Sequence, residues 1–160
     1  MKIIAIRGSN LASLAGEFAI ELGAAPLAHA GVFAIIGNTG AGKSTLLDAM
    51  CLALFDRMPR LALRSAVVIG RSDDEANQLG AADVRGILRR GAAAGFAEVD
   101  FEGDDRRCYR ARWSVRRARG KSDGALQGQE LSLTILDTGE VLGGKKTETL
   151  LAIRQRLGLS

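Results

Sequence analysis

The 160-residue sequence has no apolar run of the roughly 18 residues that a membrane-spanning helix requires, so no membrane partner is expected. Arg7 interrupts the N-terminal apolar residues before they could form the core of a secretory signal. The two cysteines, Cys51 and Cys108, have neither the spacing of a metal site nor the number that a disulfide framework needs. These absences predict a cytoplasmic protein in a reducing compartment.

The sequence also has only one histidine and no internal repeat. The single histidine, His29, lies in a segment of Ala, Gly and Pro and is expected to be solvated. There is no internal repeat and no coiled-coil heptad pattern. With 47% hydrophobic and 25% charged residues, the composition is that of a globular domain with its own core.

What the sequence does contain is the phosphate-binding loop (P-loop) pattern Gly-x-x-x-x-Gly-Lys-Ser, at residues 37–44. The apolar run GVFAIIG (31–37) precedes it and is expected to form a strand buried on both faces. A segment with helical spacing follows from Ser44 until Pro59. This context favours a loop that binds a nucleoside triphosphate over a glycine-rich turn that only caps a helix.

Each residue type in this loop has a separate role. Glycines let backbone N–H groups approach the phosphates closely, and the helix N-terminus adds further donors and a partial positive charge. Lys43 would supply a full charge to the outer phosphates, and the hydroxyl of Ser44 would complete the coordination of Mg²⁺. The predicted nucleotide-binding residues are Gly37, Asn38, Thr39, Gly40, Ala41, Gly42, Lys43, Ser44 and Thr45.

The rest of the pattern predicts further strands and a final helix. Strands are expected at residues 2–6, 17–22, 96–102, 107–116 and 130–136. A polar turn through Ser9 and Asn10 would join the first two strands. Residues 147–159 have the spacing of an amphipathic helix, and 57–95 are interpreted as a loop with one short helix near Val84–Arg90.

Residues for hydrolysis are missing. Hydrolysis of a nucleoside triphosphate usually needs an apolar strand that ends in Asp-Glu, to hold magnesium through water and to position the attacking water. The nearest pattern, LTILDTGE (133–140), has Thr138 after Asp137, and its Asp-Thr-Gly sequence is typical of a turn between two strands. The turn is the favoured interpretation, so no catalytic residue is predicted in this segment.

The residues around the P-loop carry a family resemblance. MKIIAIRGSNLASLAGEFAIEL (1–22), GVFAIIGNTGAGKSTLLDAMCLALF (31–55) and PRL (59–61) together resemble the N-terminus of the bacterial SbcC family. SbcC proteins are the ATPase subunits of a DNA-end-processing nuclease and are related to the structural-maintenance-of-chromosomes ATPases. Many relatives have an arginine near the nucleotide, two residues after the asparagine of the first turn. Here that position is Ala12, so this contact is not carried over.

The resemblance implies an α/β P-loop fold of the ABC-ATPase type, split between the two ends of a long chain with a coiled coil between them. Residues 1–160 would be the N-terminal half-head, with mixed and antiparallel β-sheet and a P-loop helix (P-loop 37–45). The coiled coil and the C-terminal half-head would lie outside these residues. The C-terminal half-head would supply the missing carboxylates, and a second SbcC-like head would form a homodimer with the first.

The same resemblance implies ATP and Mg²⁺ as ligands and ATP-gated control of an SbcD-like nuclease subunit. The substrate would be double-stranded DNA ends, in DNA repair and recombination. Two other classes stay open: an ABC transporter ATPase or other cytoplasmic P-loop protein without a DNA role, and a small nucleotide kinase or GTPase. The guanine-reading Asn-Lys-x-Asp motif does not occur, and two strands ahead of the P-loop fit a kinase poorly.

The net charge of +4 conceals one concentrated basic segment. Residues 106–121 (RRCYRARWSVRRARGK) contain eight basic and no acidic residues, whereas 14 basic residues face 18 acidic ones elsewhere. Arg110 and Arg112 would lie opposite the acids Asp100 and Glu98 of the preceding strand, as a charge-paired solvated face. Tyr109 and Trp113 would lie on the apolar face, in the core.

The last basic residues of this segment run past those acids. They either contact DNA phosphates without base specificity or form a solvated face. These four, called the distal basic residues below, are Arg116, Arg117, Arg119 and Lys121.

Overall fold

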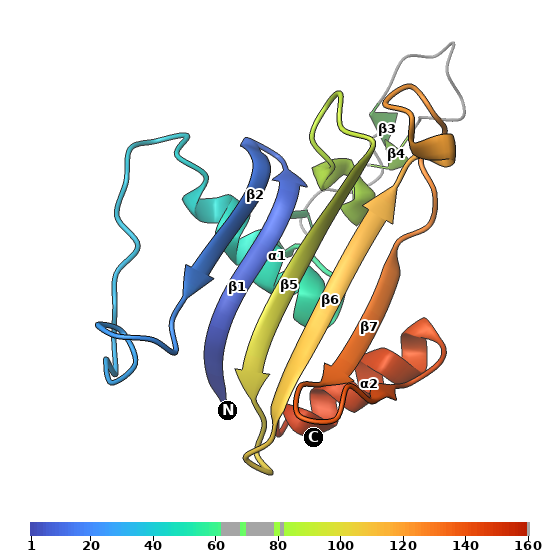
Figure 1. Ribbon diagram of the computed structural model, residues 1–160. Helices are drawn as coiled ribbons and strands as arrows, with labels where there is room; N and C mark the ends of the chain where they lie inside the picture. Colours follow the sequence, from blue (N-terminus) through green and yellow to red (C-terminus); the bar gives the residue numbers. More distant parts are fainter. Residues whose placement is uncertain (62–67, 70–78, 81, 160) are drawn as a thin grey trace.

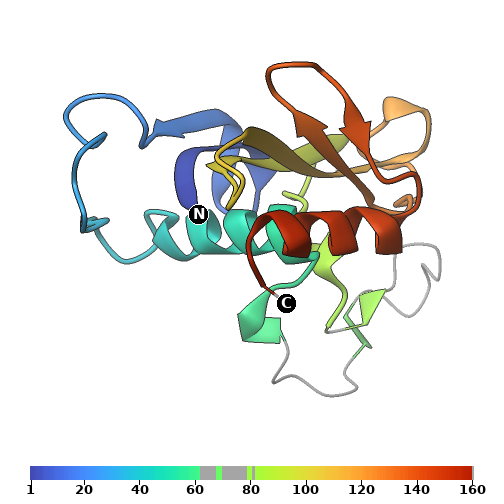
Figure 2. The same cartoon turned by 90° about the horizontal axis from the view of Figure 1, so that it is seen from below.

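The structure is a computed structural model and describes residues 1–61, 68–69, 79–80 and 82–159. Its main element is a six-stranded antiparallel sheet in the order β2-β1-β5-β6-β7-β8 (Figure 1). Its strands are β1 (Lys2–Leu11), β2 (Leu14–Glu21), β5 (Ala94–Glu102), β6 (Cys108–Arg116), β7 (Glu130–Ile135) and β8 (Val141–Leu142). Both α1 (Lys43–Phe55) and α2 (Lys146–Arg156) cover the same face of this sheet (Figure 2).

Short elements complete the described chain. They are the paired strands β3 (Val68–Ile69) and β4 (Leu79–Gly80) and the 3₁₀ turns η1 (Pro59–Leu61), η3 (Val84–Ile87) and η4 (Ala118–Gly120). The short helix predicted near Val84–Arg90 is thus observed as the turn η3, while much of the predicted loop 57–95 lies outside the described residues. No helix in the described part of the chain is long and apolar enough to cross a membrane.

Alternation along β6 decides which face of the sheet is covered. Tyr109, Ala111, Trp113 and Val115 are buried, while the residues between them point to the opposite face. Tyr109 and Trp113 are fully buried, as predicted from their position on the apolar face. The strand therefore presents its apolar residues to the helices.

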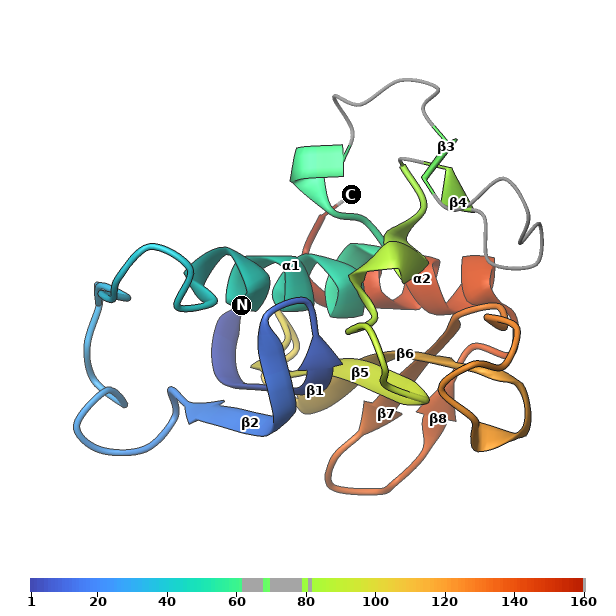
Figure 3. The same ribbon diagram turned by 90° about the horizontal axis from the view of Figure 1, so that it is seen from above.

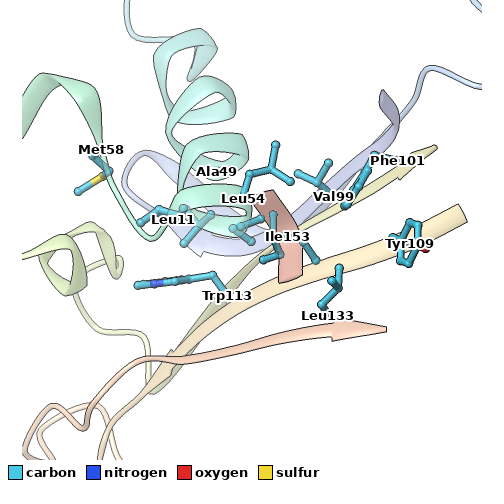
Figure 4. Packing of buried hydrophobic residues seen from close by; sticks show 14 of the residues in the cluster. Leu11, Ala49, Leu54, Met58, Val99, Phe101, Tyr109, Trp113, Leu133 and Ile153 are labelled. Carbon is cyan, nitrogen blue, oxygen red and sulfur yellow. The ribbon is translucent and has the colours of Figure 1, made fainter. Parts of the chain in front are cut away.

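The core lies between this face and the two helices. Val99, Phe101 and Leu133 of the sheet lie near Leu54 of α1 and Ile153 of α2 (Figure 4). The rings of Phe101 and Tyr109 are stacked, with 5.6 Å between their centroids. Burial of such large side chains is the main favourable term that holds the helices on the sheet.

Asp56 ties the end of α1 to three other elements. It has left-handed backbone angles (φ 52°, ψ 38°), and its N–H bonds to the carbonyl of Leu52 to end the helix. Its carboxylate accepts hydrogen bonds from Trp113 Nε1 at 2.8 Å and from Gln129 Nε2 at 3.2 Å, and it pairs with Lys146. The carboxylate therefore connects α1 with β6, with the residue before β7 and with the start of α2.

The open face of the sheet carries a layer of ion pairs. Asp100 accepts hydrogen bonds from Arg7 at 2.6 Å and from Arg110 at 2.7 Å, and Glu98 accepts one from Arg112 at 2.7 Å. The predicted pairing of Arg110 and Arg112 with these two acids is confirmed. Burial alone would raise the pKa of Asp100, but the hydrogen bonds from the two arginines outweigh it, and the pKa lies below its usual value.

The predicted turn at Ser9 and Asn10 is wrong. β1 continues to Leu11, and the chain reverses at Ala12 and Ser13. The side chain of Asn10 accepts the N–H of Gly16 at 3.0 Å and donates to the carbonyl of Ala94 at 3.1 Å. A polar side chain that suggested a turn therefore bridges β1 to both neighbouring segments.

The predicted buried strand at 31–37 is not formed. In the structure this segment belongs to a long connection that leaves β2 and returns to α1 away from the sheet (Figure 3). Val32 is 92% and Ile36 91% exposed. A strand buried on both faces needs a neighbouring strand, and within the described residues no strand pairs with this segment.

We expect Asp100→Asn to lower the free energy of unfolding at pH 7 by about 1–3 kcal/mol, because it removes the buried anion that Arg7 and Arg110 share and leaves them only Glu21 and Glu98 as acidic partners. The folded-state pKa of Asp100 is lowered, so its charge stabilises the fold above the unfolded pKa of about 3.9. This contribution is lost as the pH falls through the folded pKa. Urea unfolding between pH 7 and pH 2.5 should therefore show parent and variant converging below about pH 4. Exposed Asp123→Asn is the control and should match the parent throughout. A difference that stays constant with pH would contradict the role of the charge.

Candidate nucleotide-binding site

The P-loop passes directly into the first turn of α1. Lys43 is the first residue of the helix, and Gly42 precedes it as the N-terminal cap with φ 88°. Gly40 also has a positive φ, 86°. L-residues with side chains rarely adopt these angles, so the two glycines permit the path of the loop.

Lys43 folds back over its own loop. Its Nζ donates to the carbonyl oxygens of Gly37 at 2.6 Å and Asn38 at 2.7 Å. The lysine and the start of the loop, six residues apart, are thus brought together as the motif requires. A phosphate group placed here would offer the ammonium an anionic acceptor, which binds a cation more strongly than a neutral carbonyl does.

The two hydroxyl residues after the lysine differ in exposure. Ser44 is more accessible at the helix N-terminus, whereas Thr45 is only 4% exposed and points into the fold. Within the described part of the chain, no group of three or more His, Cys, Asp or Glu side chains is arranged to hold a metal ion. At this site the accessible hydroxyl of Ser44 is a group that could serve as one oxygen ligand of Mg²⁺, beside phosphate oxygens.

The β1–β2 hairpin lies against the loop. A Cβ atom built on Gly42 would lie 2.5 Å from Cδ2 of Leu14, the first residue of β2. Gly42 is therefore required for two reasons, its backbone angle and this contact. Nothing in the sequence indicated that Leu14 would lie at the P-loop, because only the folded hairpin brings it there.

Asp137, the nearest match to the carboxylate that hydrolysis requires, lies in the turn between β7 and β8. It pairs with Arg107 at 3.2 Å, and both side chains are largely exposed. Its pKa is lowered by backbone hydrogen bonding within the turn and by Arg107. The interpretation of this segment as a turn is confirmed.

The distal basic residues lie at and beyond the end of β6, and three of them line a hollow of about 580 Å³. Its lining includes Arg116, Arg117 and Arg119 together with Ala93 and Gln127. Arg116 lies 3.5 Å from Glu130, with both side chains about 70% exposed, and Arg117 Nη1 donates to the carbonyl of Gly124 at 2.9 Å. Arg119 is exposed on the short turn η4, and Lys121 is exposed directly after it.

Two arginines outside the motifs have defined partners that the sequence did not indicate. Arg7 bonds to Asp100 and Glu21 on the open face of the sheet. Arg89 donates from Nη1 to the carbonyls of Ala12 at 3.1 Å and Ser13 at 3.0 Å, at the reversal of the β1–β2 hairpin. The adjacent arginines 89 and 90 gave no periodic or motif signal, so Arg89 could be found only from the structure.

Comparison with known proteins gives a consistent assignment. A family model described as AAA domain matches residues 5–150. The chain is 54% identical over 161 residues to the SbcC component of the SbcCD nuclease from Pseudomonas aeruginosa, and 49% identical over 162 residues to the protein of that name from Rhodobacter capsulatus. Each match covers 100% of this chain but 13% of the relative, so the chain spans only a small part of the length of these proteins. The Bacillus subtilis protein of that name is 40% identical over 74 residues, 46% of this chain and 6% of its own length.

Comparing Gly40→Ala with Gly42→Ala should separate the two reasons for glycine in this loop. A Cβ added at Gly40 would meet open space, so only the backbone angle is strained and we expect a loss of about 1–2 kcal/mol in the free energy of unfolding. Gly42→Ala adds the contact with Leu14 and should lose about 1–3 kcal/mol more.

In urea unfolding, Leu14→Ala in the Gly42→Ala background should recover part of that extra loss, while the same change in the Gly40→Ala background should recover none. Equal losses for the two glycine variants would show that the hairpin does not restrict the loop.

Proposed function

Since the chain belongs to the AAA domain family as a protein of the SbcC type, we propose that it is the ATP-binding segment of an SbcC-like ATPase that controls a partner nuclease on double-stranded DNA ends. The observation that carries this proposal is the P-loop with Lys43 held over it at the N-terminus of α1. This arrangement gathers N–H donors and a cation at one point, as binding of a polyphosphate requires.

Binding would proceed with little change in the helix. Lys43 would exchange its two neutral carbonyl acceptors for phosphate oxygens, and the backbone N–H groups of residues 40–45 would surround the phosphate chain. Gly37, Asn38, Thr39 and Ala41 would contribute backbone to this loop, and the accessible hydroxyl of Ser44 would coordinate Mg²⁺. The bound ion would neutralise part of the charge on the outer phosphates.

Hydrolysis would need residues from elsewhere. Asp137 is held in a turn by Arg107, and no catalytic residue is therefore assigned to this segment. Val32 and Ile36 are exposed although their run has the composition of a buried strand. This supports the proposal that another segment packs against the run beside the P-loop. We assign that segment to the C-terminal half-head of the same polypeptide.

DNA contact is assigned to the distal basic residues. The acids Glu98 and Asp100 of β5 lie opposite Arg112 and Arg110, whereas Arg116 has Ala94 opposite it on β5 and only a long, exposed ion pair with Glu130 of β7. The chain that follows β6 continues beyond the upper end of the sheet, on the side opposite to the segment that precedes α1 (Figure 1). Arg116, Arg119 and Lys121 are exposed, and such cations suit contact with phosphates in any sequence.

The partners follow from the names of the relatives. Because the relatives are named as components of an SbcCD nuclease, they support an SbcD-like nuclease subunit as partner. A second SbcC-like head would supply the opposite side of the nucleotide. The alternative of a transporter ATPase has no support from these relatives. Control of a DNA nuclease is therefore the function that fits both the site and the similarity.

Lys43→Ala in the complete subunit should leave the melting temperature without nucleotide unchanged, because the side chain lies over the loop and not in the core. The parent should gain about 3 kcal/mol of stability from MgATP at 100 times its Kd, seen as a rise in melting temperature, and the variant should gain none. Lys121→Ala, which also removes an exposed lysine, is the control and should respond to MgATP as the parent does. An undiminished shift in Lys43→Ala would contradict this assignment of the P-loop lysine.

Charge reversal at Arg116, Arg119 and Lys121 should weaken binding of duplex DNA by the complete subunit uniformly across sequences. It should also flatten the dependence of log K on log salt, by about one counterion for each phosphate that the variant no longer binds. Fluorescence anisotropy across a salt series measures both quantities.

A variant reversed at Arg57, Arg106 and Arg154 is the matched control, since these exposed residues lie outside the distal group. Equal effects in the two triple variants would mean that only net charge matters and that the distal residues form a solvated face.

A further inference from the structure

The reversal of the β1–β2 hairpin is a direct neighbour of the predicted phosphate site. Leu14 follows the reversal, and its side chain is the atom group nearest to a Cβ built on Gly42. Gly42 is bonded to Lys43, the residue that closes the P-loop. A side chain fixed on this reversal is therefore held close to the place where phosphates would bind.

Arg89 is fixed on that reversal by both its side chain and its main chain. Its Nη1 bonds to the carbonyls of Ala12 and Ser13, at 3.1 Å and 3.0 Å. Its backbone N–H donates to the carbonyl of Asn10 at 2.9 Å, and the N–H of Ala12 donates to Ile87 at 2.7 Å. The segment that carries Arg89 is thus held against the end of β1 like a short additional strand.

The charge of Arg89 has no acidic partner among the residues that the structure describes. Arg7, Arg85 and Arg110 each form an ion pair with an aspartate. The two carbonyls bonded to Arg89 are neutral and engage only Nη1, while a guanidinium has five N–H donors on three nitrogens. A cation with donors in reserve is therefore held on the hairpin reversal, next to Leu14, which contacts Gly42 of the anion-binding loop.

Open space adjoins this arginine. A hollow of about 370 Å³ lies where the reversal meets the segment after η3, and its lining includes Ala12, Leu88, Arg89 and Arg90. Arg89 therefore borders open space and does not pack wholly inside the core.

We propose that Arg89 is a further nucleotide-binding residue, whose guanidinium contacts an oxygen of the phosphate chain held by residues 37–45. This inference rests on the proposed function, because it requires a nucleoside triphosphate in the P-loop. The carbonyls of Ala12 and Ser13 orient the guanidinium before the ligand arrives, so little side-chain entropy is lost on binding.

Titration of the complete subunit with MgATP tests this assignment. Arg89→Gln should weaken MgATP binding about tenfold or more, the loss of a charge-assisted hydrogen bond. Arg89→Lys keeps the charge and should recover part of the affinity. Arg90→Gln is the matched control, since it removes the neighbouring, exposed arginine and should bind MgATP like the parent. Melting temperatures without nucleotide show how much each change affects the fold.

MgATP binding by Arg89→Gln equal to that of the parent would overturn the inference, as would an equal loss in Arg90→Gln. A loss of affinity that Arg89→Lys does not recover, accompanied by a lower melting temperature, would also overturn it, since Arg89 would then only support the hairpin. Lys43→Ala, measured in parallel, separates this outcome from failure of the proposed function. If the parent binds no MgATP, or Lys43→Ala binds it equally well, the proposed function fails and the role of Arg89 fails with it.

Discussion

The carboxylate of Asp56 is the interaction on which the placement of the P-loop depends. It ends α1, accepts the indole N–H of Trp113 and pairs with Lys146, while its side chain is only 7% exposed. A buried carboxylate is stable only with such partners, so the four elements that meet there must keep their relative positions. The opposite end of α1 carries the phosphate loop, and β6, which supplies Trp113, leads to the distal basic residues. One anchored helix end therefore fixes the frame in which both surfaces are presented.

Several features that depend on nearby residues were predicted from the sequence, although the turn expected at Ser9 and Asn10 was wrong. Alternation identified β5 and β6, and the spacing of the P-loop located the start of α1. Contacts between distant segments were not readable from the sequence. Leu14 reaches the P-loop, and Arg89 reaches the reversal of the hairpin, only after the hairpin and the segment after η3 have packed together. The prediction of a buried strand at residues 31–37 was wrong for a different reason. The composition of this run indicates what surroundings a strand of this kind needs, but it contains no information on whether those surroundings are within these residues.

The strand register divides the basic segment 106–121 into two parts. Pairing of β5 with β6 places Asp100 opposite Arg110 and Glu98 opposite Arg112, so these charges are used within the fold. Arg116 faces Ala94 at the end of the pairing. A shift by one residue would move the whole set to the opposite face and leave the acids without partners. The position at which the acids stop along β5 thus determines which arginines of β6 form ion pairs across these two strands.

The exposed segment before the P-loop also affects how readily the polypeptide aggregates. Residues 22–42 contain no lysine, arginine, aspartate or glutamate, and five consecutive apolar residues, 32–36, stand within them. Apolar, β-prone and uncharged stretches of this length are the ones that assemble into intermolecular sheets, and natural sequences often flank them with charges that prevent this. Residues 22–42 contain no such flanking charges, and the run 32–36 is followed directly by the glycines of the phosphate-binding loop. The glycine pattern of a phosphate-binding loop thus leaves an apolar run without flanking charges, and such a run favours aggregation as long as it stays exposed.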